Sequence, residues 1–275
     1  MKITVLLENT ACRADLCAAH GLSLYLEACG RRILFDMGPD EGFLQNARTL
    51  GVDLTAVELA VLSHGHDDHG GGLVAFCRVN PAAPVYVHRH ALGDFCALAP
   101  EKEPRHIGLP PEALALGERL TLTGNETALA SGLTLFAGQE PVFDAMAASA
   151  TLFEKTEAGF VPDDFGHEQN LLIEEGDWAV LVAGCAHRGI VNILAEARRR
   201  LGRDPDAVVG GFHLFQLPQE DPASAELIRR TGEALLPGNT VYYTGHCTGG
   251  YAYDILHSIL GDRLRPISGG TVLTF

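Results

Sequence analysis

The densest group of side chains with metal-binding chemistry lies at residues 64–69. Its four candidate ligands are His64, His66, Asp68 and His69. An apolar segment at 59–62, predicted as a buried strand, precedes the group, and three glycines follow it. Because a tight loop at a strand's end points its side chains in divergent directions, the first two histidines can serve one metal ion, and the aspartate and last histidine a second. Imidazole with carboxylate favours zinc, iron or manganese over calcium or magnesium.

The composition excludes several classes of protein. The chain has 275 residues, 47% of them apolar, which suffices for one large domain. Its net charge of −15 argues against a nucleic-acid groove, because such grooves bind phosphates through Lys and Arg. The charge does not exclude a small phosphorylated substrate, since bound metal ions supply positive charge locally. No apolar stretch approaches the length of a transmembrane helix, so no membrane partner is expected.

The seven cysteines indicate the compartment. They are scattered between Cys12 and Cys247 without a CxxC pair, which favours a reducing cytosol with most thiols as small core residues. The first eight residues are typical of a strand and lack the features of a signal peptide. We therefore expect a cytoplasmic protein with a small-molecule substrate, and the sequence leaves a homodimer open.

Short apolar runs alternate with helical patterns, which predicts a mixed α/β fold. Strands are expected at 3–7, 22–27, 33–35, 59–62, 85–87, 133–136, 171–173, 179–182, 208–210, 241–244 and 271–273. Helices are expected at 43–50, 189–201, 223–236 and 251–260. The irregular segment 91–140, with Pro100, Pro104, Pro110 and Pro111, is interpreted either as an insertion or lid over a site or as a connector without functional weight.

The metal-binding run and its strand resemble the metallo-β-lactamase superfamily, which carries the same His-x-His-x-Asp-His pattern in its first half. The resemblance implies an αββα sandwich: one domain of two similar halves, roughly 1–90 and 165–275, with two divalent metal ions between the sheets. Zinc is expected, with iron and manganese as alternatives. Residues 34–38 are similar to a superfamily segment whose aspartate supports the metal loop, so Asp36 is either such a support, or a ligand, or a plain turn residue.

Five segments are together similar to one branch of the superfamily, labelled 7,8-dihydropterin-6-methyl-4-(β-ribofuranosyl)-aminobenzene-5′-phosphate synthase-like. They are residues 19–23, 63–73, 184–192, 210–214 and 245–249. The resemblance runs from about residue 3 to the C-terminus. It implies a synthase that acts on a phosphoribosyl aromatic amine and a dihydropterin.

The resemblance also implies ligands in the second half. His246 matches the superfamily's last metal-binding histidine. Where the superfamily usually has a bridging aspartate, this chain has Cys185, with His187 two residues later. We predict His187 as a ligand and Cys185 as either a ligand, which would favour zinc, or a packed thiol. His167 lies 18 residues before Cys185, about where the superfamily has its third histidine, and competes with His187 for the first metal.

Two further histidines are expected near the substrate. His213 follows the predicted strand 208–210, where it could bind substrate or protonate a leaving group. His20 is assigned the same substrate-binding role. Asp68 is expected to hold the second metal and orient the nucleophile, which makes Asp68 and His213 the predicted catalytic residues.

These residues favour a metal-dependent hydrolase in which a metal-activated water attacks an ester, lactone, thioester or phosphate ester. Two alternatives stay open. One is the synthase that the branch resemblance implies. The other is a binding or sensing protein with an occupied metal centre and little turnover, because the missing bridging aspartate would weaken hydroxide formation.

Overall fold

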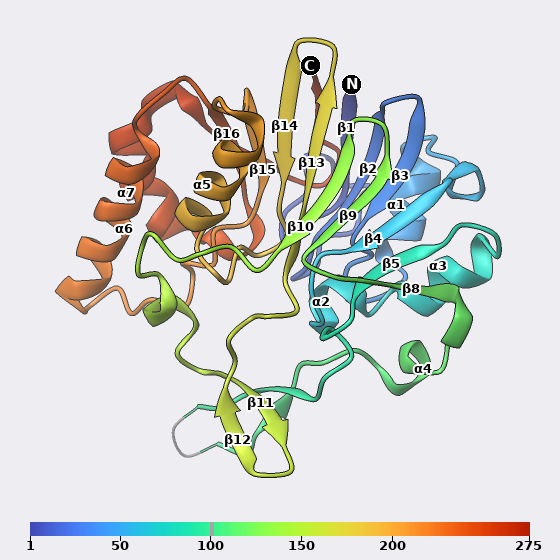
Figure 1. Ribbon diagram of the computed structural model, residues 1–275, viewed down its shortest axis with the longest axis horizontal. Coiled ribbons are helices and arrows are strands. Elements are labelled where there is room, and N and C mark those ends of the chain that lie inside the picture. The colour runs from blue at the N-terminus through green and yellow to red at the C-terminus, as the bar shows by residue number, and fades with distance from the viewer. Residues whose placement is uncertain (100–101) are drawn as a thin grey trace.

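Two large β-sheets stack face to face, and helices cover both outer faces (Figure 1). The structure is a computed structural model that describes residues 1–99 and 102–275, so Pro100 of the segment 91–140 lies outside the described residues. The layers follow the order helix, sheet, sheet, helix, which is the predicted αββα sandwich. Among the described residues, no helix is long and apolar enough to cross a membrane.

The first sheet is built mainly from the N-terminal half. Its strands, in spatial order, are β18 (Val272–Thr274), β1 (Lys2–Leu7), β2 (Ser23–Ala28), β3 (Arg31–Phe35), β4 (Leu59–Leu62), β5 (Val85–His88) and β8 (Leu120–Thr123). Pairing is antiparallel from β18 to β3 and parallel from β3 to β8. The helices of this half are α1 (Gly42–Thr49), α2 (Asp67–Gly70), α3 (Leu73–Val79) and α4 (Pro111–Leu114).

The second sheet repeats this plan with the C-terminal half. Its strands, in spatial order, are β17 (Leu264–Pro266), β16 (Val241–Thr244), β15 (Ala207–Gly210), β14 (Trp178–Val182), β13 (Gln169–Glu175), β10 (Leu133–Ala137) and β9 (Glu126–Ala130). Helices α5 (Ile190–Leu201), α6 (Pro222–Leu235) and α7 (Gly250–Leu260) cover its outer face (Figure 1).

The core lies in three layers of apolar side chains. The middle layer fills the space between the sheets, where Val5, Phe35 and Val182 are fully buried. The outer layers lie between each sheet and its helices, with Phe76 of α3 in one and Ile193 of α5 in the other. Because the central strands are buried on both faces, their sequences are continuous apolar runs, and this is why the sequence predicted them.

A third, small sheet lies apart from the sandwich (Figure 1). Its strands, in spatial order, are β12 (Gly159–Pro162), β11 (Leu152–Thr156), β6 (Phe95–Ala97) and β7 (Arg105–His106). The segment 91–140 is therefore not a single insertion. Its first part supplies β6 and β7 to the small sheet, whereas β8, β9 and β10 belong to the two large sheets.

The eleven expected strands and four expected helices all occur, with ends within two residues of those predicted. The strands that the sequence did not reveal are β6, β7, β8, β9, β11, β12 and β17. Most of them lie in the small sheet or at the edge of a large one, and β9 and β12 contain no buried residue. Without a buried face, a strand has no apolar pattern to predict it.

Candidate metal centre

The candidate ligands of both halves meet at one edge of the sandwich. The loop after β4 and the short helix α2 carry His64, His66, Asp68 and His69. The loops after β14 and β16 bring Cys185, His187 and His246 to the same place. Parallel strands end at the same edge of their sheet, so residues far apart in sequence converge there. All these side chains except Asp68 are buried.

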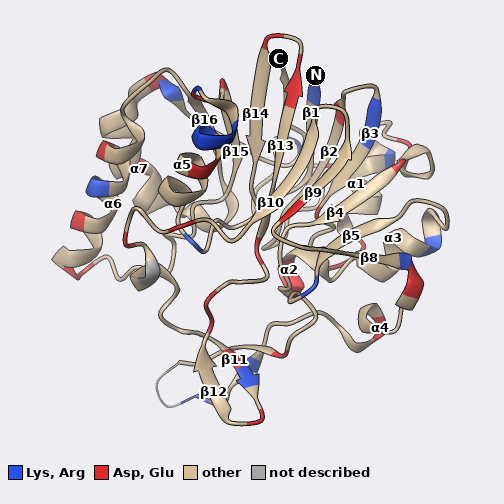
Figure 2. Cartoon of the chain, viewed as in Figure 1, with Lys and Arg blue, Asp and Glu red and all other residues tan. Residues whose placement is uncertain are grey.

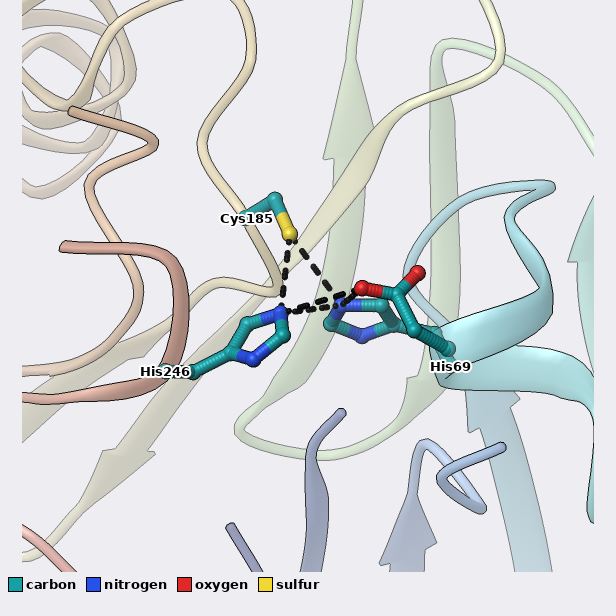
Figure 3. A group of neighbouring side chains, drawn as sticks. His69, Cys185 and His246 are labelled. Atoms are coloured by element: carbon teal, nitrogen blue, oxygen red, sulfur yellow. Dashed lines mark hydrogen bonds and ion pairs between the residues drawn. The ribbon is translucent and has the colours of Figure 1, made fainter. Parts of the chain in front are cut away.

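One group of candidate ligands consists of Asp68, His69, Cys185 and His246. Their ligand atoms lie within 4.8 Å of one another. Figure 3 shows the Cys185 thiol between the two imidazoles, with its Sγ 3.1 Å from His69 Nε2 and 3.3 Å from His246 Nε2. Asp68 Oδ2 lies 3.3 Å from His246 Nε2. Two imidazoles, a thiol and a carboxylate around one point are a donor set typical of zinc.

A second group lies next to the first and shares Cys185. His64, Cys185 and His187 also have their ligand atoms within 4.8 Å of one another, and so do His64, His66 and Asp68. His64 Nε2 is 3.2 Å from His187 Nε2. The cysteine at the position of the superfamily's bridging aspartate therefore touches both groups.

His167 lies beside this centre but does not present a free nitrogen to it. Its Nδ1 accepts a hydrogen bond from the backbone N–H of Gly65 at 3.1 Å, and its Nε2 donates to Asp163 Oδ2 at 3.0 Å. His187, by contrast, is held through its backbone, whose N–H donates to Glu168 Oε1 at 2.7 Å. The ring of His187 stays turned towards His64, so the geometry favours His187 over His167 in the first group.

Asp36 orients one histidine of each group through hydrogen bonds, His69 directly and His64 by way of Ser63. Its Oδ2 accepts hydrogen bonds from His69 Nδ1 at 2.6 Å and from Ser63 Oγ at 2.7 Å. The Ser63 oxygen in turn accepts from His64 Nδ1 at 2.8 Å. With Nδ1 of both histidines occupied by donation, each Nε2 points into the centre and is the ring atom left to bind a metal ion.

His246 is oriented by two residues that the sequence analysis missed. Its Nδ1 donates to Asn9 Oδ1 at 2.8 Å, and its backbone N–H donates to the buried carboxylate of Glu8. Glu8 and Asn9 directly follow β1, so the available signal was a pair of polar residues at the end of an apolar strand. Glu168, which holds the loop of His187, follows no comparable run.

The donor atoms fit a bound cation. Nδ1 of each ring already has a partner, and His69 Nε2 and His246 Nε2 face each other 3.1 Å apart. His66 Nε2 is buried without a hydrogen-bond partner among the described residues. Lone pairs this close repel unless a proton or metal ion lies between them, and a buried nitrogen without a partner costs free energy.

The local electrostatics separate the histidines by their pKa values. Burial lowers the pKa of His66 to about 3 and holds those of His64 and His187 well below the usual range. Burial also acts to lower the pKa of His69, but the Asp68 and Asp36 carboxylates outweigh it and raise the value to about 9. Three histidines are thus neutral at pH 7, the state in which imidazole binds metals.

Backbone strain is concentrated at the centre. Six non-glycine residues have a left-handed φ, and five of them lie at or next to the site: Asp36, Phe165, Ala186, His213 and His246. Such conformations cost of the order of 1 kcal/mol each and persist where surrounding contacts impose them. Here they turn the chain sharply at strand ends, which is what aims the candidate ligands inward.

His213 and His20 lie at the mouth of the centre. They line an open pocket together with His66, Asp68, Cys185 and His187. His213 is 4% exposed, and neither of its ring nitrogens has a hydrogen-bond partner among the described residues. His20 is half-exposed, with its Nε2 3.4 Å from Asp68 Oδ2. The structure therefore places both histidines at the pocket beside the candidate metal centre, and their contacts with substrate stay a prediction.

The comparisons with known proteins agree with this fold. The family profile of the metallo-beta-lactamase superfamily matches residues 19–129, which include the run 64–69. A solved structure described as Tm1679, a metal-dependent hydrolase of the beta-lactamase superfamily, superposes with a TM-score of 0.81 and 25% identity, covering 100% of this chain and 99% of that one. The chain thus matches the family model of the metallo-β-lactamase superfamily over residues 19–129, and it shares the fold of a solved member of that superfamily over its full length.

Within the superfamily, the chain is similar to one curated relative over its full length. The 7,8-dihydropterin-6-methyl-4-(beta-D-ribofuranosyl)-aminobenzene-5'-phosphate synthase of Methanocaldococcus jannaschii is 27% identical over 290 aligned residues, covering 100% of this chain and 97% of the relative. Zn(2+)-bound PqqB from Methylobacterium extorquens has the same fold at 13% identity, with a TM-score of 0.57 over 100% of both chains.

Proposed function

We propose that the chain is a metal-dependent hydrolase with two divalent ions, most simply zinc. His64, His66 and His187 would hold the first ion, and Asp68, His69 and His246 the second. Cys185 would bridge them. The observation that carries the proposal is that two groups of candidate ligands share the Cys185 thiol. One group is His64, Cys185 and His187 and the other is Asp68, His69, Cys185 and His246, with ligand atoms within 4.8 Å of one another in each.

The ions, when bound, would acidify a water molecule and polarise the scissile bond of the substrate. The chain's own residues would do the rest. His213 has two unpartnered ring nitrogens at the pocket and would donate a proton to the leaving group. Asp68 reaches both His69 and His246 and would orient the attacking water by accepting a hydrogen bond.

The pocket supports a small-molecule substrate. Its lining combines candidate metal ligands with the apolar side chains of Ile107, Leu152 and Phe215, the mixture of polar and apolar groups that is typical of small-ligand sites. An ester, lactone, thioester or phosphate ester is the substrate class we propose. A cytoplasmic location is supported by the seven cysteines, all of which are free thiols.

The test is metal analysis combined with turnover. Zinc-loaded protein should contain two equivalents and hydrolyse at least one member of an esterase, lactonase, thioesterase and phosphodiesterase panel. His66→Ala should lose metal and turnover, whereas His257→Ala, which changes an exposed histidine of α7, should keep both. Full activity in His66→Ala would refute the assignment. Full metal occupancy without turnover on any substrate would instead support a binding or sensing role.

A synthase is the second candidate, and the full-length similarity to the curated synthase supports it. That reaction class would join a phosphoribosyl aromatic amine to a dihydropterin within the same pocket. Incubation with both compounds separates the candidates by product. A joined pterin product, formed as the dihydropterin loses a leaving group, identifies a synthase, and release of a leaving group without a joined product identifies a hydrolase.

A further inference from the structure

A single cationic side chain lies at the pocket above the candidate metal centre. Arg105 of β7 is the only lysine or arginine among the described residues that line it. Its guanidinium forms no salt bridge or hydrogen bond within the described ranges 1–99 and 102–275. It does act on the neighbouring Asp67, whose pKa is raised by burial and lowered in part by the Arg105 charge. A positive group without a fixed partner is therefore available to a ligand.

The backbone holds Arg105 in place over the metal loop. Arg105 pairs with Ala97 in the small sheet, and two residues later the N–H of Ile107 donates to the carbonyl of Phe95 at 2.8 Å. The carbonyl of Ile107 accepts from the N–H of Asp67 at 2.7 Å. The small sheet is thus fastened directly to the first turn of α2. The backbone of Arg105 is therefore fixed relative to the metal loop, and only its exposed side chain has to be ordered when a ligand binds.

An exposed aromatic ring lines the same pocket from the other half of the chain. Phe215 is 42% exposed, and its ring centroid lies 5.6 Å from that of His213 and 5.4 Å from that of His20. Its backbone N–H donates to the carbonyl of Cys247 at 3.1 Å, which ties it to the loop of His246. The ring therefore offers the pocket an apolar face of the kind on which an aromatic ligand packs.

The surrounding charge makes the Arg105 contact selective. The chain carries a net charge of −15, and Figure 2 shows the basic residues dispersed over several elements rather than gathered at one place. Anions are therefore repelled by most of the surface, and a local cation is needed to hold one at the pocket. A planar guanidinium suits a carboxylate or phosphate, with which it forms paired hydrogen bonds.

We propose that this pocket recognises small molecules that combine an anionic group, bound by Arg105, with an aromatic ring, packed on Phe215. The inference rests on the proposed function for placing the reacting bond at the metal centre. It adds a substrate class, namely aromatic phosphates or carboxylates, and two residues that determine specificity.

Calorimetric titration of the zinc-loaded protein tests the proposal with four probes. Phenyl phosphate has both features, benzoate replaces the phosphate by a carboxylate, methyl phosphate lacks the ring, and benzyl alcohol lacks the charge. The variants are Arg105→Gln, Arg105→Lys and Phe215→Ala. Arg78→Gln, which removes an exposed arginine of α3, is the matched control for net charge.

Phenyl phosphate should bind most tightly to the wild-type protein. Arg105→Gln should weaken it by about 10- to 100-fold, the range of a hydrogen-bonded charge pair, and Arg105→Lys should recover part of the loss. Phe215→Ala should weaken phenyl phosphate by about two- to tenfold and leave methyl phosphate unchanged. A larger effect of Arg105→Gln on benzoate than on phenyl phosphate would identify carboxylates as the preferred anions.

Two results would overturn the proposal. One is unchanged phenyl phosphate affinity in Arg105→Gln, which would mean that the zinc ions alone bind the anion. The other is an equal loss in Arg78→Gln, which would mean a general charge effect. Failure of the proposed function looks different: Arg105-dependent binding would persist while the protein hydrolysed nothing on the panel.

Discussion

Asp36→Asn is the most direct test of how the centre is oriented. The carboxylate is fully buried and accepts three hydrogen bonds, from Ser63 N at 2.7 Å, Ser63 Oγ at 2.7 Å and His69 Nδ1 at 2.6 Å. Asparagine has nearly the same shape and tolerates the left-handed backbone of this position, where φ is 59°. The substitution therefore removes accepting capacity without creating a cavity.

The magnitude follows from the geometry. The amide of the variant has one oxygen and one NH₂ group, so in either orientation the NH₂ faces at least one N–H or O–H donor. If it faces His69, the ring is driven to accept at Nδ1 and to carry its proton on Nε2, where the metal should bind. The loss of one or two charge-assisted hydrogen bonds should lower the free energy of unfolding by about 2–4 kcal/mol. Zinc affinity at the His69 position should fall about 10- to 100-fold.

Competition with a fluorescent zinc chelator measures the affinity, and urea unfolding of the metal-free protein measures the stability. Asp53→Asn is the control, because Asp53 also accepts hydrogen bonds from a neighbouring backbone N–H and hydroxyl but lies on the surface. It should leave zinc affinity unchanged. Unaltered affinity for both zinc ions in Asp36→Asn would refute the argument that Asp36 fixes the ring of His69.

Three further predictions concern the bridging position, the packing behind it and acid stability. Cys185→Ala should lose about one zinc equivalent by elemental analysis while Cys185→Asp keeps two; two equivalents in both would exclude a bridging thiolate. Gly184→Ala should destabilise the fold by about 1–3 kcal/mol and weaken zinc binding, because the new methyl group would collide with Ser63 Oγ. In the control Gly250→Ala the methyl group meets open space, so both stability and zinc affinity should stay unchanged. Burial, with His90 and Arg89, lowers the pKa of His88 from 6.5 to about 4, so the unfolded chain binds the extra proton between these values. The contribution of neutral His88 to the free energy of unfolding is therefore complete above pH 6.5 and decreases by at most about 3 kcal/mol as the pH falls to 4. Urea unfolding of the metal-free His88→Gln variant should show a shallower pH dependence than that of the wild-type protein. Parallel curves would contradict this prediction.

The sequence predicted the parts of the fold whose physics is local. Strands such as β4 and helices such as α5 are predicted because their apolar patterns report burial. The small sheet was not predicted, since β7 has only two residues and both are exposed. The small sheet also depends on the pairing of β6 with β11, which are far apart in the sequence.

The residues of the candidate site likewise fall into those that the sequence revealed and those that it did not. The residues at 64–69 were recognisable because six consecutive positions hold four donors. Glu8, Asn9 and Glu168 were missed, because each is a single polar residue that acquires its role only when another segment packs against it. The sequence predicted His187 as a ligand but left His167 in competition with it for the first metal. Spacing along the chain does not reveal that the backbone of Gly65 and the carboxylate of Asp163 already occupy both nitrogens of His167.

The distribution of the candidate ligands over both halves has a consequence for the order of folding. Each half contributes donors to both groups, and the contacts between His69 and His246 span 177 residues of sequence. Contacts of such separation form late, because the loop between them must close first. A metal ion therefore finds its site only after the two sheets have docked. The ion would stabilise a sandwich that has already assembled, whereas the ion of a zinc finger is needed for that domain to fold at all.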